Sequence, residues 1–463
     1  MTAVDSEKPP LLRPPELTTG EPRSTSRLEL FFDLAYVLCV AELAMSLLSD
    51  LDWDGVWEFV ALFTVVWLSW AQYTLHNNRF DTDDLILRFA KLGAMLAILG
   101  AAASMSGATG DKVVPFTCSY ALGRVILAGL YYRAWRHVPA ARGTTTVYLV
   151  AMTAVAALWL ISLAVPAPLK FVLWSVAGVV DVAAPIVAGR RQGRAPLHLE
   201  HLPDRFGLLV ILVLGEVIAS IVTGVHDAKW ATVSVVIAVA GFLIAAALWW
   251  AYFDVGGTVS AHAIQRADEE ESGARSPRDR ADDDAVGSLD LGLGSDEDGQ
   301  ETPTDDRDAA PGVGRGEEPH SELVDESDRE PVDERHDLFI YGHLPLTAGI
   351  LAVAVGIEEL VLHPDRSLPS SGSLLVTSGI VAFLLGAGVL LRGGEQKSRL
   401  SVAWPAVAAT AVLLWGLLGP RDALAFSAGA AVLITAAAAA GAVISRRTPG
   451  KVHRPLQQTQ RST

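Results

Sequence analysis

The 463-residue chain is 51% hydrophobic and carries a formal net charge of −16. Its apolar residues fall in blocks of about 20, the length that crosses a bilayer, which excludes an ordinary water-soluble globular protein. The acidity is local, because residues 266–337 hold 26 Asp and Glu against 8 Arg and leave the rest of the chain at only +2.

The apolar blocks predict an all-α polytopic membrane protein with about twelve transmembrane helices. Residues 1–26 lack an apolar core of signal-peptide length and predict a disordered cytoplasmic tail. The helices are expected at residues 30–48, 56–75, 86–107, 113–133, 146–165, 169–188, 206–225, 231–253, 338–361, 373–392, 400–418 and 422–444. Only three residues, 166–168, separate the fifth and sixth blocks, which leaves open whether both cross the membrane or form a re-entrant hairpin.

Five regions follow from this pattern. The tail of residues 1–26 is followed by a first membrane block at 27–253, an acidic loop at 254–337, a second membrane block at 338–445 and a C-terminal tail at 446–463. The loop is too polar to bury a core, so we expect a disordered cytoplasmic linker.

Basic residues favour cytoplasmic termini. With the N-terminus inside, the short inner segments hold 18 Lys and Arg and the outer loops hold 5. Positive charge accumulates on the cytoplasmic side of membrane proteins. The sequence therefore predicts a membrane protein with both termini in the cytoplasm.

Two parts of the chain share a pattern. Aligning residues 27–42 with 201–216 superposes Phe32 on Phe206, Leu34 on Leu208 and Glu42 on Glu216. The second and eighth blocks share Trp-x-x-Tyr, at residues 70–73 and 249–252. These matches predict a parallel repeat of six plus six helices.

Carboxylates within the apolar blocks are the first candidates for function. Glu216 lies about 15 Å along its helix from Phe206, near the centre of the hydrocarbon core. Glu42 occupies the matching position in the first helix, whereas Asp33 lies nearer its inner end. A carboxylate is costly at such depth and marks an ion or substrate pathway. The alternatives are a helix-packing hydrogen bond for Glu216 and an interfacial cap, or a partner for Arg27 or Arg79, for Asp33.

A polar cluster follows the second helix. Its charged members are spaced so that Arg79 with Asp83 and Asp84 with Arg88 could form ion pairs four residues apart, with Thr82 as the helix cap. This is either a well-capped helix start or an ion or substrate vestibule, to which Asp81 also belongs. Its oxygen ligands and single histidine do not resemble a soft-metal site, and we expect no metal or cofactor.

Further charged residues lie within the spans. Arg124 requires an anion in the membrane, and Asp181, Glu42 and Glu216 are the candidates. Arg205 shares a helix face with Glu216, and His343 and Glu358 lie near the two ends of the ninth helix. His343 is either a proton relay or an interfacial residue.

Four motifs together resemble the bacterial low temperature requirement A protein family: LELFFDL at 28–34, NNRFDTDD at 77–84, DRFGLLVILVLGE at 204–216 and HLPLTAGILAVAVGIE at 343–358. Asp204 stands where we would expect Glu in that family, and the acidic loop is unusually long. The resemblance implies a multi-pass inner-membrane protein associated with growth in the cold, without a settled activity.

Two functions are compatible with these features. The first is a plasma-membrane transporter or channel-like protein for a cation, a proton or a small solute, with Glu42 and Glu216 as central groups and Arg124 and Arg205 as counter-charges. The second is a membrane scaffold or sensor whose acidic loop recruits basic partners. We expect no enzyme, because no catalytic motif is present, and no nucleic-acid partner; the partners are the lipid bilayer and a small cation or solute, with oligomerisation left open.

Overall fold

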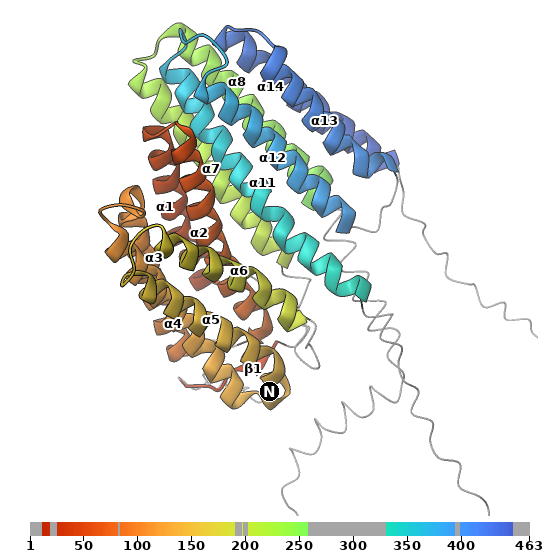
Figure 1. Ribbon diagram of the computed structural model, residues 1–463. Coiled ribbons are helices and arrows are strands. Elements are labelled where there is room, and N and C mark those ends of the chain that lie inside the picture. The colour runs from red at the N-terminus through yellow and green to blue at the C-terminus, as the bar shows by residue number, and fades with distance from the viewer. Residues whose placement is uncertain are drawn as a thin grey trace, which may run out of the picture. The chain divides into compact units, whose positions relative to one another are not determined.

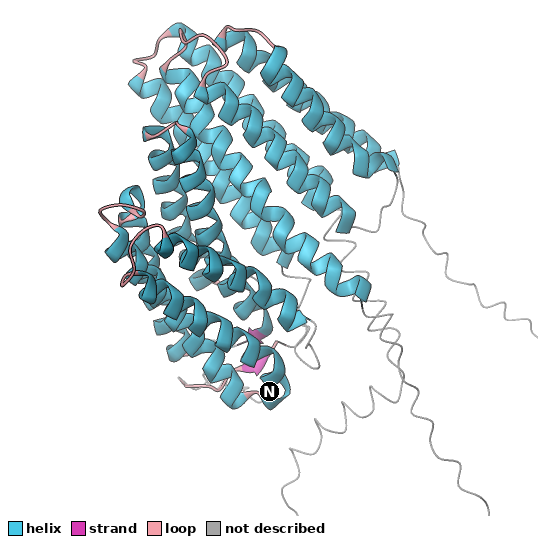
Figure 2. Cartoon of the chain, in the orientation of Figure 1, coloured by secondary structure: helices cyan, strands magenta, loops and turns pink. Residues whose placement is uncertain are grey.

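The computed structural model describes residues 12–18, 26–81, 84–189, 197, 202–257, 330–393 and 399–447. Helices make up nearly all of the described chain (Figure 2). By their internal contacts, Met1–Gln265 and Asp333–Thr463 form one unit and Arg266–Val332 a second one. The acidic loop and the C-terminal tail of the sequence prediction lie largely outside the described residues.

Twelve long helices confirm the all-α polytopic prediction within the described ranges. The first block holds α1 (Arg27–Ser49), α2 (Trp53–Arg79), α3 (Leu85–Ala103), α4 (Val113–His137), α5 (Arg142–Ser162), α6 (Leu169–Gly189), α7 (Leu202–Asp227) and α8 (Thr232–Trp250). The second holds α11 (Glu330–Leu362), α12 (Ser371–Gly393), α13 (Arg399–Leu418) and α14 (Ala423–Arg447). Short 3-10 helices η1 (Met105–Gly107) and η2 (Pro139–Ala141) precede α4 and α5, and α8 continues as the π-helix η3 (Ala251–Gly257).

Eleven of the described helices are long and apolar enough to cross a membrane, and α13 contributes a shorter apolar stretch, Ala403–Leu418. The stretches Pro139–Ser162 and Leu169–Gly189 are both among the eleven, so α5 and α6 each have the length to span. Large apolar side chains such as Phe89 and Leu96 point outward, with 68% and 70% of their surface exposed. These outward side chains require lipid, so the protein contacts the bilayer.

Helix α1 packs against α2, α3 and α7, and α3 to α6 pack successively against one another (Figure 1). Helix α8 contacts α7 and α14, and α12 to α14 form a further packed series. Aromatic residues fill the space between α4, α5 and α6, where Trp159 stacks on Trp174 with ring centroids 4.2 Å apart. The core is therefore built from contacts between helices that lie far apart in the sequence as well as from neighbours.

Glycines bring α11 and α12 into close contact. They recur at seven-residue intervals in both helices and face one another in the pairs Gly342 and Gly386, Gly349 and Gly379, and Gly356 and Gly372. A Cβ atom added at Gly349 would lie 2.4 Å from the carbonyl oxygen of Gly379. Small residues at matched positions allow two helix backbones to approach in a membrane.

A short antiparallel β-ladder was not predicted. Strand β1 (Glu16–Leu17) pairs with β2 (Phe80–Asp81), with Glu16 opposite Asp81 and Leu17 opposite Phe80. The expectation of a disordered tail over residues 1–26 is therefore wrong for residues 12–18. Two residues per strand give no periodicity that a sequence could reveal, and the pairing depends on the position of the end of α2.

The predicted six-plus-six repeat is not confirmed. Phe32 and Phe206 are both fully buried, as a repeat requires, but the matched tryptophans differ. Trp70 is buried, whereas Trp249 has 49% of its surface exposed. The repeat stays a prediction.

Candidate functional site

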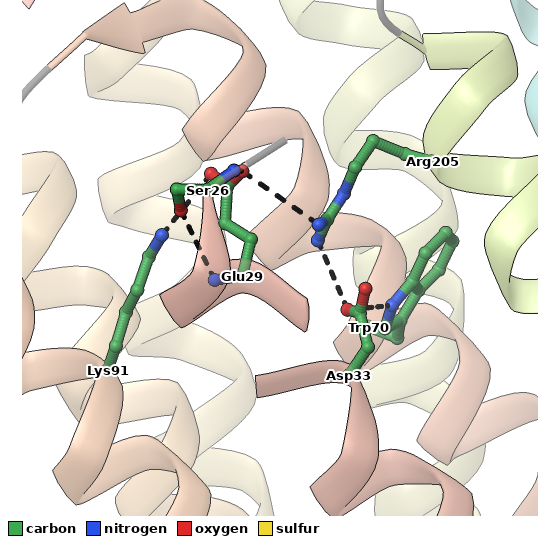
Figure 3. Close-up of polar contacts among 6 residues, drawn as sticks. All are labelled: Ser26, Glu29, Asp33, Trp70, Lys91 and Arg205. Atoms are coloured by element: carbon green, nitrogen blue, oxygen red, sulfur yellow. Dashed lines mark hydrogen bonds and ion pairs between the residues drawn. The ribbon is translucent and has the colours of Figure 1, made fainter. Parts of the chain in front are cut away.

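Three helices bring charged side chains together near the start of α1, and a fourth adds a tryptophan (Figure 3). Asp33 Oδ1 on α1 accepts hydrogen bonds from Trp70 Nε1 on α2, at 2.9 Å, and from Arg205 Nη2 on α7, at 3.1 Å. Glu29 lies one turn before Asp33, with its carboxylate oxygens 3.3 Å from Lys91 Nζ on α3 and 3.9 Å from Arg205 Nη1. We call these five residues the Asp33 network.

The local sequence explains the position of the two carboxylates. Ser26 caps α1 by accepting a hydrogen bond from the Glu29 backbone amide, and the Glu29 side chain accepts one from the Ser26 amide in return. Residues four apart lie on one helix face, so Asp33 points in the same direction as Glu29. The capping box therefore fixes Glu29 and aligns both acids toward α7.

The charges of the Asp33 network balance. Two carboxylates face one lysine and one arginine, and Asp33, Lys91 and Arg205 have less than a tenth of their surface exposed. Ion pairs with little exposure cost desolvation energy that their attraction only roughly offsets, so the network is weak evidence of stability. Asp33 Oδ2 is buried and has no hydrogen-bond partner within the described chain.

An apolar cavity lies next to the Asp33 network. It is lined by residues of α1, α2, α7 and α11: Tyr36, Val40, Phe63, Val66, Trp67, Trp70, Leu209, Val213 and Thr347. Trp70 belongs to both the cavity and the network. The buried Trp67 Nε1 has no hydrogen-bond partner among the described residues. The surface that lines the cavity is apolar.

Glu42 and Glu216, predicted as central groups with Arg124 and Arg205 as counter-charges, lack those partners. Both side chains are half-buried, and neither forms an ion pair with a described residue. Glu216 lies one turn beyond the cavity residue Val213 and close enough to Glu358 on α11 for the two carboxyl groups to interact. The prediction that Arg124 and Arg205 act as counter-charges to Glu42 and Glu216 is therefore corrected. Arg124 pairs with Asp181, and Arg205 pairs with Asp33.

Arg124 pairs with Asp181, one of the three candidate anions. Arg124 Nη2 on α4 lies 2.7 Å from Asp181 Oδ2 on α6, and both side chains are almost completely buried. Tyr120, one turn before Arg124, accepts a hydrogen bond from Arg124 Nε at 2.9 Å and donates one to Asp181 at 3.2 Å. Gln72 on α2 donates to the Asp181 backbone carbonyl. This cluster ties α2, α4 and α6 together.

His343 is fully buried within α11 and does not lie at an interface. Its Nδ1 is 2.7 Å from the Phe339 carbonyl oxygen, and its Nε2 is 2.9 Å from the Tyr252 hydroxyl of η3. Both ring nitrogens are engaged, so the interfacial alternative does not apply.

The cluster after α2 is a helix start clamped from α4. Asp84, and not Thr82, caps α3 by accepting from the Leu87 amide, and its carboxylate pairs with Arg133 and not with Arg88. Arg133 Nη2 lies 2.6 Å from Asp84 Oδ2 and also donates to the Arg13 carbonyl. Burial alone would raise the pKa of Asp84. The hydrogen bonds and positive charge of Arg133, together with hydrogen bonds from the Leu87 and Arg13 amides, outweigh burial and hold the pKa below its ordinary value.

The structure describes only part of the rest of that cluster. The side chains of Asp81 and Asp83 and the position of Thr82 lie outside the described residues, so the Arg79 to Asp83 pair is untested. Arg79 points into the protein and has 1% of its surface exposed. Among the described residues, no three His, Cys, Asp or Glu side chains lie close enough to hold a metal ion.

Sequence reasoning missed several partners. Glu29 and Lys91 were visible as charges near helix ends, but nothing in their spacing indicated Arg205, which lies 172 residues from Asp33. Tyr120 carried a local signal, because it stands four residues before a buried arginine on the same helix face. Arg133 carried none.

Comparisons with known proteins agree with the four sequence motifs. The model of the family described as "Bacterial low temperature requirement A protein (LtrA)" matches residues 24–277 and 316–443. A protein of Rhizobium meliloti (strain 1021), described as uncharacterized, is 24% identical over 366 residues, which cover 77% of this chain and 75% of that protein. No solved structure matches the chain.

Proposed function

The chain belongs to the bacterial low temperature requirement A protein family, and from this premise we propose that it is a transporter or channel-like protein for a cation, a proton or a small solute. The observation that carries the proposal is the Asp33 network, buried among spanning helices beside a cavity. Ionisable groups inside a membrane are costly and characteristically line ion and substrate pathways.

The proposed pathway runs between α1, α2, α7 and α11. The Asp33 network forms one end, the cavity with Trp67 and Trp70 follows it, and Glu216 with Glu358 lies beyond. Free carboxylate lone pairs at both ends suit a cation or a proton, because each can attract positive charge without releasing a protein partner. Asp33 Oδ2 is one such group.

Flux through the purified protein in liposomes tests the proposal. Potassium, sodium and proton movement are measured for the wild type, Asp33→Asn, Glu216→Gln and Glu42→Gln, with the exposed Asp54→Asn as the matched control. We expect flux in the wild type and the control, and its loss in Asp33→Asn and Glu216→Gln. Unchanged flux in all three pathway variants would remove the assigned roles.

For the topology, we propose a bacterial cell membrane with cytoplasmic termini. The count of 18 basic residues in the inner segments against 5 in the outer loops supports this orientation. With α13 counted as a crossing beside the eleven longer helices, the number is even and both termini lie on one side. Labelling of single cysteines introduced in the two tails, from outside intact cells, tests it.

A scaffold or sensor is the second candidate, favoured by the confinement of acidic charge to residues 266–337. In that case the segment recruits basic partners and the membrane body anchors it. Deletion of residues 266–329 would then abolish growth in the cold while leaving the helices intact, whereas the transport proposal expects growth to persist.

A further inference from the structure

Arg79, at the end of α2, is a buried cation without a carboxylate partner in the described chain. Only 1% of its surface is exposed, and Nη1 donates a hydrogen bond to the Tyr148 hydroxyl of α5, at 3.1 Å. The Tyr131 hydroxyl of α4 also lies close to the guanidinium. Its guanidinium also lies 5.1 Å from the Tyr148 ring centroid. Its Nε–H is buried without a hydrogen-bond partner. A buried cation in this condition is expensive unless an anion joins it.

Unpartnered polar groups surround this arginine. Tyr131 on α4 stacks on Tyr148 with ring centroids 4.6 Å apart, and its hydroxyl is buried without a hydrogen-bond partner. His76, one turn before Arg79, meets Tyr131 edge-on at 4.8 Å. The Thr18 hydroxyl is likewise unpartnered, and the Thr18 amide donates to the Arg79 carbonyl. Hydroxyl and guanidinium N–H donors are the groups that bind anions.

Among the carboxylates whose side chains the structure describes, Asp337 in the first turns of α11 is the one to be weighed against this interpretation. It acts electrostatically on Tyr148 and Tyr341, but it does not form an ion pair with Arg79 in the described structure. Asp337 has other interactions of its own. Asp337 therefore does not partner Arg79 Nε, which has no hydrogen-bond acceptor among the described residues.

We infer that Arg79 and Tyr131 form a binding site for one small inorganic anion of halide size. The anion would accept hydrogen bonds from Arg79 Nε and the Tyr131 hydroxyl. Strand β1 pairs with the residues that follow Arg79, and Arg79 and Tyr131 are both buried, so the site is closed to a lipid headgroup and favours a compact ion. The site is independent of the proposed transport pathway, because none of its residues belongs to the Asp33 network or the cavity.

Thermal unfolding of the full-length protein in detergent tests the site. Sodium gluconate is replaced by sodium chloride or bromide at constant ionic strength, with sodium phosphate as a separate arm. A ligand that binds only the folded state raises the unfolding temperature with its concentration. We expect chloride and bromide to raise it in the wild type and in Arg142→Gln, an exposed arginine that serves as the control.

Two variants separate a bound anion from a structural arginine. Arg79→Gln should abolish the halide response and be no less stable than the wild type in gluconate, because it removes an uncompensated buried charge. Tyr131→Phe should keep the fold and weaken the apparent halide affinity about tenfold, as expected for one lost hydrogen bond to a charged ligand. Asp337→Asn should strengthen the halide response by removing a repulsive charge.

Three outcomes would overturn the inference. One is the absence of any halide shift in the wild type. Another is an equal shift in the wild type and Tyr131→Phe, which remains informative if Arg79→Gln fails to fold. The third is a response to phosphate alone, which would replace the halide by a larger oxyanion.

Discussion

At the scale of single residues, the pairs that matter link distant parts of the chain. The sequence indicated that Arg124 needs an anion and offered three, and the structure selects Asp181 because α4 and α6 are joined through α5. The pairing of Asp33 with Arg205 could not be predicted from the sequence, since that contact depends on how α7 packs on α1. The sequence shows which residues carry a charge, and hydropathy predicts how deep in the membrane they lie. Their ion-pair partners depend on tertiary packing.

Replacing Arg205 should destabilise the fold. Among the described residues, Arg205→Gln leaves Asp33 and Glu29 with Lys91 as their basic partner. Removal of one member of a buried ion pair costs about 3–5 kcal/mol. We expect most of this loss to be recovered in the double variant Asp33→Asn, Arg205→Gln. Denaturant unfolding of both single variants and the double variant measures the coupling, and additive losses would contradict it.

Asp84 should make stability depend on pH. Its folded pKa is depressed below the unfolded value of about 3.9, so its ion pair with Arg133 stabilises fully above that value. The contribution declines as the pH falls through this range and is lost below the folded pKa. We expect the unfolding temperatures of the wild type and Asp84→Asn to differ at pH 6 and to converge toward pH 3, with exposed Asp54→Asn showing no comparable change.

At the scale of helices, hydropathy predicted all twelve elements because each must supply an apolar length near that of the bilayer. Boundaries moved where caps decide them: Ser26 starts α1 and Asp84 starts α3. The ladder of β1 and β2 was missed because two-residue strands have no detectable period. The glycines of α11 and α12 were visible as a seven-residue repeat, but their pairing depended on the register of two antiparallel helices.

The glycine pairs should tolerate no side chain at their centre. In Gly349→Ala the new Cβ would lie 2.4 Å from the Gly379 carbonyl oxygen, so the helices must separate. Overpacking of this kind typically costs about 1–3 kcal/mol. Gly215→Ala on α7 is the matched control, because a Cβ there meets nothing within 4 Å, and it should be neutral or slightly stabilising. Equal unfolding temperatures for the two variants would show that α11 and α12 do not depend on this contact.

At the scale of the whole molecule, charge is divided between a nearly neutral membrane body and an acidic segment at 266–337. The described helices contact one another directly. The 18 basic residues of the inner segments, which orient the chain, lie outside the acidic segment. Orientation follows the positive charge near the ends of the helices. The body should therefore insert and pack without the acidic segment.

Deletion of residues 266–329 tests this division. We expect the shortened protein to insert in the same orientation, to unfold within a few degrees of the wild type and to retain whatever flux the full chain supports. Replacing the segment with a neutral Gly/Ser linker of equal length controls for the connection between α8 and α11, because such a linker keeps the reach but removes the charge. If flux persists in both variants while growth in the cold is lost, the acidic segment carries the biological role and the scaffold candidate gains over transport. If flux disappears in the deletion but not in the linker variant, the segment acts only as a spacer, and the pathway among α1, α2, α7 and α11 remains the proposed site.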